Sequence, residues 1–199
     1  MEKETVVKLF GEPRWRRKEI LRYARARDAT PEVKALLEEC ITELSPRLTY
    51  KVLYREFPVK TDGEKVSLGF GEYTCTLLSR HLGTCKRVVL FVATVGHEID
   101  WLISRYGVLS PAKAHIMDAI GSERVESLCD AFCEEVAKRE ERAGHRTCTR
   151  ISPGYCDLPL AMQKDIFAVL ECQKRLGVTL GENLLMSPKK TVSALIGIE

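Results

Sequence analysis

Residues 87–94, RVVLFVAT, are the stretch of sequence around which the rest of the chain is organised. Six apolar residues stand in a row, and three of them are valines, whose branched Cβ atoms favour an extended backbone. A short and continuous apolar run is typical of a strand that is buried on both faces, whereas a strand with one face in water alternates apolar and polar residues. We therefore expect residues 87–94 to form the central strand of a sheet.

Three other segments have the signature of strands. Residues 49–57 and residues 66–70 each alternate apolar and polar side chains, as strands do. Asp62 and Gly63 lie between them and are typical turn residues, so these two segments are predicted to pair as a hairpin. Residues 191–198 are apolar again and predict a late return strand.

Helices are predicted on both sides of the central strand. Thr30 and Pro31 mark a helix start, with threonine as the N-cap and proline in the first turn, and apolar residues then recur at helical spacing. A much longer helix is expected at residues 110–142, where a serine and a proline again mark the start. Shorter helices are expected at residues 72–82, 97–106 and 158–176, with Gly83 and Gly177 at the ends of the first and the last.

The strands are thus scattered among helices without a βαβ repeat. The predicted fold is a single α+β domain, with a mostly antiparallel twisted sheet, packed helices and the long helix at about 110–142. We divide the chain into a basic N-terminal helical extension packed on the domain, residues 1–30, and the α+β domain itself, residues 31–199.

Composition places the chain among ordinary globular proteins. The 199 residues are 45% hydrophobic and carry a formal net charge of +3, which is too close to balance to indicate nucleic acid or a membrane surface as partner. No run of about 18 apolar residues exists, so no membrane span is expected. The first ten residues lack the apolar core of a secretory signal, and the eight cysteines contain no Cys-x-x-Cys pair. Reduced thiols and a cytoplasmic location are therefore expected.

Positive charge is concentrated in residues 14–27, which we call the basic stretch. Its cations are Arg14, Arg16, Arg17, Lys18, Arg22, Arg25 and Arg27. Basic residues with interleaved aromatics can bind nucleic acid or an acidic protein. Because no nucleic-acid motif accompanies these charges, we favour a solvated helix whose apolar side packs inward, and nucleic acid is not expected as a partner.

The sequence offers no self-contained catalytic or metal-binding motif. The four histidines lack HExxH and zinc-finger spacings, and no nucleophile elbow, P-loop or dinucleotide-binding glycine motif occurs. Cys129 and Cys133 share a helix face, but their apolar neighbours favour buried thiols over metal ligands. Cys156 has no histidine placed beside it in the sequence to activate it. We therefore predict neither catalytic residues nor a bound metal.

The candidate ligand-binding segment is residues 150–159, RISPGYCDLP. Arg150 offers a planar fork of donors that suits a carboxylate or a phosphate. Gly154 lets the backbone approach a ligand closely, and Tyr155 adds an aromatic face with a polar tip. Pro153 stiffens the segment. The alternative is a tight loop between two helices that carries a surface arginine.

This segment also carries a family resemblance. The Arg-x-x-Pro-Gly-Tyr pattern at residues 150–155, with a helix and then Met-Ser-Pro-Lys-Lys-Thr-Val-Ser at residues 186–193, resembles the C-terminal activation domain of cobalamin-dependent methionine synthase. The resemblance is best between about residues 110 and 198. It departs at residues 156–158, Cys-Asp-Leu, where the synthase domain has a Pro-Ala-Cys type of continuation. In this departure the chain is similar to small free-standing relatives of the domain.

The resemblance implies a binding site for S-adenosylmethionine. It assigns to this site Arg150, Ser152, Pro153, Gly154, Tyr155 and Asp130. Asp130 corresponds to an acidic residue that contacts the ligand in the family, and a solvated helical carboxylate is the alternative. The ligand carries a sulfonium, an ammonium and a carboxylate, so its site needs both an arginine and an acid.

For function, the resemblance implies reactivation of cobalamin in methionine biosynthesis. Cobalamin on methionine synthase is occasionally oxidised from cobalt(I) to inactive cobalt(II), a flavodoxin-type protein reduces it in the fused systems, and S-adenosylmethionine then methylates the cobalt. The chain is accordingly expected to act as an accessory subunit, in trans, on a corrinoid-binding methionine synthase or another corrinoid methyltransferase. The alternative is a non-catalytic module that docks on a corrinoid protein or senses S-adenosylmethionine.

Overall fold

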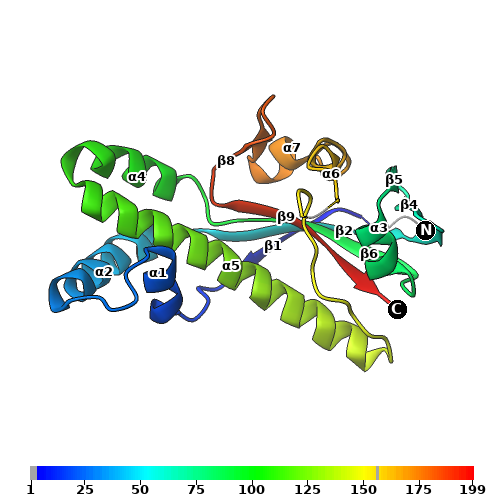
Figure 1. Cartoon of the computed structure of the whole chain (residues 1–199), viewed down its shortest axis with the longest axis horizontal. Helices are drawn as coiled ribbons and strands as arrows, with labels where there is room; N and C mark the ends of the chain where they lie inside the picture. Colours follow the sequence, from blue (N-terminus) through cyan, green and yellow to red (C-terminus); the bar gives the residue numbers. More distant parts are fainter. Residues whose placement is uncertain (1–3, 156) are drawn as a thin grey trace.

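A four-stranded antiparallel sheet forms the centre of the computed structural model, which describes residues 4–155 and 157–199 (Figure 1). In spatial order its strands are β1 (Val6–Phe10), β2 (Tyr50–Pro58), β6 (Arg87–Thr94) and β9 (Thr191–Ile198). β6 lies between β2 and β9, with Phe91 opposite Tyr54 on one side and Ala194 on the other. The predicted central strand and the predicted late strand are both confirmed.

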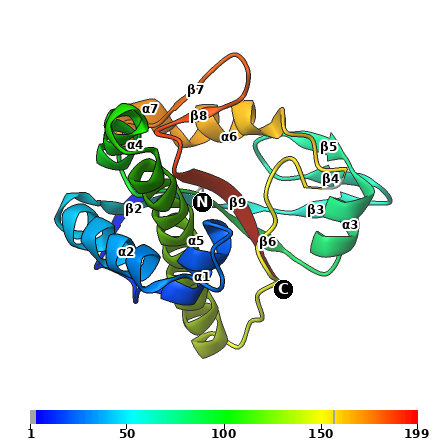
Figure 2. The ribbon, with the colours of Figure 1, turned by 60° about the vertical axis from the view of Figure 1, so that its left-hand side comes forward.

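The two faces of the sheet pack into two separate cores. Alternate residues of β6 belong to different cores, Val89 and Phe91 to one and Val88 and Leu90 to the other. The first face is covered by α1 (Arg17–Tyr23), α2 (Pro31–Leu44), α4 (Glu98–Leu109) and α5 (Pro111–Arg142). The second is covered by α3 (Thr76–Leu82), α6 (Met162–Leu170) and α7 (Cys172–Leu176), and Figure 2 shows the sheet between these layers. A strand between two apolar layers has no face in water, which explains the unbroken apolar run of β6.

The long helix α5 crosses the first face and confirms the helix expected at about 110–142 (Figure 1). Its Phe132 ring lies 6.3 Å from the ring of Phe10, 5.2 Å from that of Tyr54 and 4.9 Å from that of Phe91, measured between centroids. These three rings come from β1, β2 and β6, so a single side chain of α5 packs against three strands of the sheet. The predicted α+β class and the single domain are confirmed.

A fully buried arginine on α5 binds the N-terminal segment. The guanidinium of Arg124 donates to the carbonyl oxygens of Pro13 (2.7 Å) and Arg14 (2.9 Å). It also lies 4.0 Å from the centroid of the Trp15 ring. The same segment contributes β1, a strand that the sequence pattern did not predict. β1 and α1 therefore belong to the sheet and to the core that α5 covers, respectively.

The predicted pairing of residues 49–57 with residues 66–70 is wrong. β2 pairs with β1 and β6 instead, and Asp62 and Gly63 join two short strands, β3 (Lys60–Asp62) and β4 (Lys65–Ser67). Gly63 has a φ of +58°, the left-handed conformation that tight hairpins favour. The physical reason is burial: β2 is mostly buried and lies inside the sheet, whereas β3 is exposed and presents too little apolar surface to cover it.

Two of the predicted helices are interrupted. Residues 72–82 form a short strand, β5 (Glu72–Thr74), before α3 begins, with the Cys75 sulfur accepting from the backbone N–H of Leu78. Residues 158–176 form α6 and α7 rather than one helix, because Glu171 adopts a left-handed φ of +53° between them. The remaining elements are a 3₁₀ turn (Ser45–Arg47), β7 (Thr179–Leu180) and β8 (Met186–Ser187). Among the described residues, no helix combines the length and the apolar character needed to cross a bilayer.

Candidate functional site

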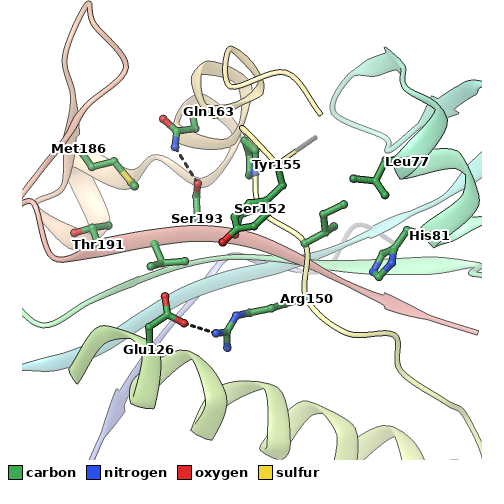
Figure 3. Close-up of a pocket in the computed structure, with 13 residues that line it drawn as sticks. Leu77, His81, Glu126, Arg150, Ser152, Tyr155, Gln163, Met186, Thr191 and Ser193 are labelled. Carbon is green, nitrogen blue, oxygen red and sulfur yellow. Dashed lines mark hydrogen bonds and ion pairs between the residues drawn. The ribbon is translucent and has the colours of Figure 1, made fainter. Parts of the chain in front are cut away.

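A pocket of about 500 Å³ opens beside β9, between α5, α6 and the segment that contains residues 150–155 (Figure 3). Its lining residues are Leu77, His81, Glu126, Arg150, Ile151, Ser152, Pro153, Tyr155, Gln163, Met186, Thr191, Val192 and Ser193. The mixture of apolar walls with a few charged and polar groups is typical of small-molecule sites, and so is the volume.

The segment that forms one wall of the pocket is joined to the sheet before it turns away. Ile151 and Leu195 exchange two backbone hydrogen bonds, of 3.0 and 2.9 Å, which extends the edge of β9 by one bridge. The chain then turns, with the N–H of Tyr155 donating to the carbonyl of Ser152 at 3.3 Å. Gly154 has a φ of +90°, a conformation that side chains with a Cβ rarely adopt. Glycine is therefore required for the backbone of this wall, although Gly154 is not among the residues that line the pocket.

Arg150 is the cation of the pocket, and two acids of α5 hold it. Its guanidinium donates to Glu126 Oε2 at 2.5 Å and to Asp130 Oδ1 at 2.6 Å. Burial by itself lowers the pKa of Arg150, but the surrounding negative groups, Asp130 and Glu126 among them, outweigh burial and raise that pKa above its usual value. The guanidinium is thus charged at every physiological pH. Figure 3 shows Arg150 and Glu126 meeting beneath the pocket.

A residue of the basic stretch reaches the same cluster. Arg16 donates to Asp130 Oδ2 at 2.7 Å and to Glu123 Oε1 at 3.0 Å. Asp130 therefore lies between two arginines, Arg16 and Arg150, and its side chain is 50% exposed. No local sequence signal could have placed Arg16 here, since more than a hundred residues separate it from its partners.

The opposite wall of the pocket comes from residues 186–193. Met186, Thr191, Val192 and Ser193 line it, and the Ser193 hydroxyl accepts a hydrogen bond of 3.5 Å from Gln163 of α6. The two sequence elements that carry the family resemblance, far apart along the chain, thus face each other across one cavity (Figure 3).

Comparison with protein-family models gives a match over residues 77–199, to the vitamin B12 dependent methionine synthase activation domain. This chain belongs to that family. The crystal structure of the MetH reactivation domain bound to AdoHcy is similar in fold, with a TM-score of 0.70 and 16% sequence identity over 98% of this chain and 78% of that chain. No curated protein matches the chain.

The predicted site residues of this activation-domain relative fall into two groups. Arg150, Ser152, Pro153 and Tyr155 line the pocket, whereas Gly154 and Asp130 do not. Gly154 lies in the turn between Pro153 and Tyr155, and Asp130 stands behind the pocket as a partner of Arg150. Tyr155 is 67% exposed, so its ring lies at the mouth of the pocket and can contact a bound ligand or a partner protein. Their role in binding stays a prediction.

Glu126 is a pocket residue that the sequence reasoning missed. It precedes Asp130 by four residues on α5, so the two carboxylates share one face of the helix. The spacing alone could have suggested Glu126 as a second acid near Arg150, once Asp130 was chosen. Gln163 has no comparable signal, because its place opposite Ser193 depends on how α6 packs on the sheet.

The departure of the chain from the family pattern lies where the pocket segment meets α3. Asp157 accepts from the backbone N–H of Leu77 at 3.2 Å and from the Cys75 thiol at 3.3 Å. It therefore acts as an additional cap of α3 and links the pocket segment to that helix. Cys156, which we did not expect to be a nucleophile, lies outside the described residues.

The described cysteines are free thiols. Burial raises the pKa of Cys129 well above its usual range and that of Cys172 to about 12, so these thiols are protonated and poorly nucleophilic. The sulfur atoms of Cys85 and Cys148 are 3.5 Å apart. Within residues 4–155 and 157–199, no group of three or more histidine, cysteine, aspartate or glutamate side chains is placed to hold a metal ion.

Proposed function

We propose that the chain binds S-adenosylmethionine in the pocket beside β9 and presents it to the cobalamin of a partner protein. The observation that carries this proposal is that the two sequence elements of the family resemblance line one cavity, at residues 150–155 and 186–193. Membership of the activation-domain family supports the same ligand class. So does the similar fold of the MetH reactivation domain, whose structure holds AdoHcy, the demethylated form of this methyl donor.

The ion pairs of the pocket suit a zwitterionic ligand. Arg150 is bound to Glu126 and Asp130 at present, and its planar fork fits a carboxylate equally well. We expect the carboxylate of the methionine moiety to take the place of Glu126 on Arg150. Glu126 is then free to face the ammonium or sulfonium charge. One internal ion pair is exchanged for two with the ligand, and no charge is left buried without a partner.

Orientation is the contribution of this chain to the reaction. A cobalamin held by the partner would supply the nucleophile for the methyl group. In such a transfer the methyl group would pass to the cobalt as its bond to sulfur breaks, the sulfur would keep that electron pair, and the ligand would leave as a neutral thioether. Because no proton moves in this transfer, the chain needs no general base. Holding the sulfonium methyl against the corrinoid would make the transfer effectively unimolecular, and this proximity would be the main source of the rate enhancement.

The partner in this proposal is a corrinoid-binding methionine synthase or another corrinoid methyltransferase, which the chain meets in trans in the cytoplasm. A flavodoxin-type protein is the proposed reductant that returns cobalt(II) to cobalt(I). Tyr155 at the mouth of the pocket, 67% exposed, is available to the corrinoid side of such a complex.

The test is a reactivation assay with purified components. A corrinoid methyltransferase without an activation domain of its own is mixed with a reductant, S-adenosylmethionine and this chain, and the visible spectrum of cobalamin is followed. We expect methylcobalamin to return faster with the chain present and the rate to saturate with its concentration. Equal persistence of cobalt(II) with and without the chain, for each of several corrinoid partners, would contradict the proposal.

The second candidate function is a non-catalytic module that binds S-adenosylmethionine or docks on a corrinoid protein. It is favoured by Asp157, which replaces the family continuation and bonds to the start of α3. This module would bind the ligand in calorimetry and fail to accelerate methylation in the same assay.

A further inference from the structure

Two cysteines that are far apart in the sequence meet near the end of β9. Cys85 lies in the loop between α3 and β6, and Cys148 lies two residues before Arg150. Their sulfur atoms are 3.5 Å apart, although 63 positions separate them along the chain. A disulfide bond is about 2 Å long, so both residues are thiols here. The fold has nevertheless brought together the two atoms that a disulfide would join.

The backbone on either edge of β9 holds the two cysteines in place. On the free edge, the N–H of Cys148 donates to the carbonyl of Gly197 at 2.9 Å. On the edge that pairs with β6, the N–H of Lys86, which follows Cys85, donates to the carbonyl of Ile198 at 2.9 Å. The two sulfur atoms therefore meet across the strand, over its last residues.

Gly197 leaves the space in which the sulfur atoms meet. A Cβ at this position would lie 2.5 Å from the Cys85 sulfur and 3.5 Å from the Cβ of Cys148. A glycine inside a strand weakens the strand and often marks a place where another part of the chain approaches closely. Here it lets a cross-link pass over β9.

The two thiols differ in how well solvent reaches them. Cys148 is half-buried, whereas Cys85 is 7% exposed. Burial and, to a smaller degree, the neighbouring Cys148 raise the pKa of Cys85 to about 12, so Cys85 is protonated. An oxidant in solution therefore reaches Cys148 first, and Cys85 is placed behind it. Redox-sensitive sites often combine an accessible thiol with a second thiol that resolves its oxidised form.

We propose that Cys85 and Cys148 form a site of reversible oxidation, at which a hydroperoxide converts the two thiols into a disulfide. With hydrogen peroxide, the Cys148 sulfur attacks one oxygen, the O–O bond breaks, and a sulfenic acid and one water are formed. The Cys85 sulfur then attacks the sulfenic sulfur, the S–O bond breaks, and the second water leaves. The two thiols lose two electrons and two protons in total, and the peroxide is reduced to two waters.

The disulfide would tie the pocket segment to the sheet. This segment is joined to β9 by two isolated bridges, Thr147 with Ile198 and Ile151 with Leu195. Arg150 lies between these bridges, so a covalent bond at Cys148 restrains the backbone that carries it. The inference depends only on the geometry of this chain, so its failure leaves the proposed function untouched.

Peptide mapping of the full chain tests the cross-link directly. After treatment with hydrogen peroxide and removal of the excess, trypsin releases residues 81–86, HLGTCK, and residues 147–150, TCTR, each with a single cysteine. We expect mass spectrometry to find these two peptides joined, and dithiothreitol to separate them. Cross-links between other cysteines only, or a sulfenic or sulfinic acid at residue 148 without a cross-link, would overturn the inference.

Thermal unfolding tests whether the bond restrains the fold. Because the disulfide closes a long loop, the midpoint should rise on the order of 5–10 °C on oxidation and return with dithiothreitol. Cys148→Ser should lose this rise, whereas Cys133→Ser, at another half-buried cysteine, should keep it. An equal rise in Cys148→Ser would overturn the inference. If that variant does not fold, the peptide map of the native chain decides.

Discussion

Arg124 and Arg150 both bind carboxylates of helix α5, but their surroundings differ. The Arg124 side chain is completely buried and bonds to Glu123 and to two backbone carbonyl groups of the N-terminal segment. The Arg150 side chain is 24% exposed and bonds to the side chains of Glu126 and Asp130, which are themselves partly exposed. Backbone partners in a dry core cannot be exchanged without unfolding, whereas side-chain carboxylates at a pocket can be replaced by those of a ligand. The comparison teaches that an arginine is available to bind a ligand when the carboxylates that now hold it can be replaced by those of the ligand.

The largest expected effect is on stability, at Arg124. Arg124→Met removes one of the two arginines that bond to the buried Glu123, the other being Arg16, and it removes the bonds to residues 13 and 14. The free energy of unfolding should therefore fall by about 3–5 kcal/mol. Urea denaturation measures this change. Arg175→Met is the control, since the Arg175–Glu171 pair lies on the surface and should cost less than about 1 kcal/mol. A similar small cost for both variants would show that the buried cluster contributes nothing to folding.

The next effect is on ligand affinity, at Arg150. Arg150→Ala should weaken binding of S-adenosylmethionine by about 1.5–3 kcal/mol if the guanidinium bonds to the ligand carboxylate. Its effect on unfolding should stay within about 1 kcal/mol, because Glu126 and Asp130 remain in contact with solvent. Arg146→Ala, at an exposed position of the same loop, is the control for calorimetry. An unchanged dissociation constant would remove Arg150 from the binding site.

A third prediction separates backbone strain from loss of the site. Gly154 and Gly144 both have a left-handed φ, of +90° and +79°, so a valine at either position should cost about 1–3 kcal/mol of stability. A Cβ at Gly154 would also lie 3.2 Å from Leu160, whereas nothing lies within 4 Å of one at Gly144. We expect Gly154→Val alone to lose ligand binding. Normal binding by this variant would mean that the turn merely connects two helices.

The smallest effect concerns Arg16, which bonds to a partner of Arg124 and to a partner of Arg150. Arg16 is 39% exposed and donates to Glu123 and Asp130, so Arg16→Met should cost about 1 kcal/mol or less. Because Arg16 and Arg124 share Glu123, the double variant should deviate from additivity by at least about 0.5 kcal/mol. If the losses of unfolding free energy in urea denaturation were strictly additive, Arg16 and Arg124 would not be coupled through Glu123.

Several parts of the fold could be predicted because their signal is local. The apolar run of β6, the spacing along α5 and the threonine cap of α2 each depend on residues close in sequence. The partner of β2 has no such signal. Residues 66–70 are nearer to β2 along the chain, but β2 pairs with β6, which covers more of its apolar surface. That difference exists only in the folded sheet.

The candidate site divides in the same way. The sequence by itself determined that residues 150–155 form a turn with an arginine, a glycine and an aromatic ring, and that residues 191–198 form a strand. Only the tertiary structure brought them together and set Arg150 against Glu126 and Arg16 against Asp130. The reason is physical: backbone conformation follows from neighbouring side chains, whereas ion pairs and strand edges depend on which surfaces are buried against each other when the whole chain folds.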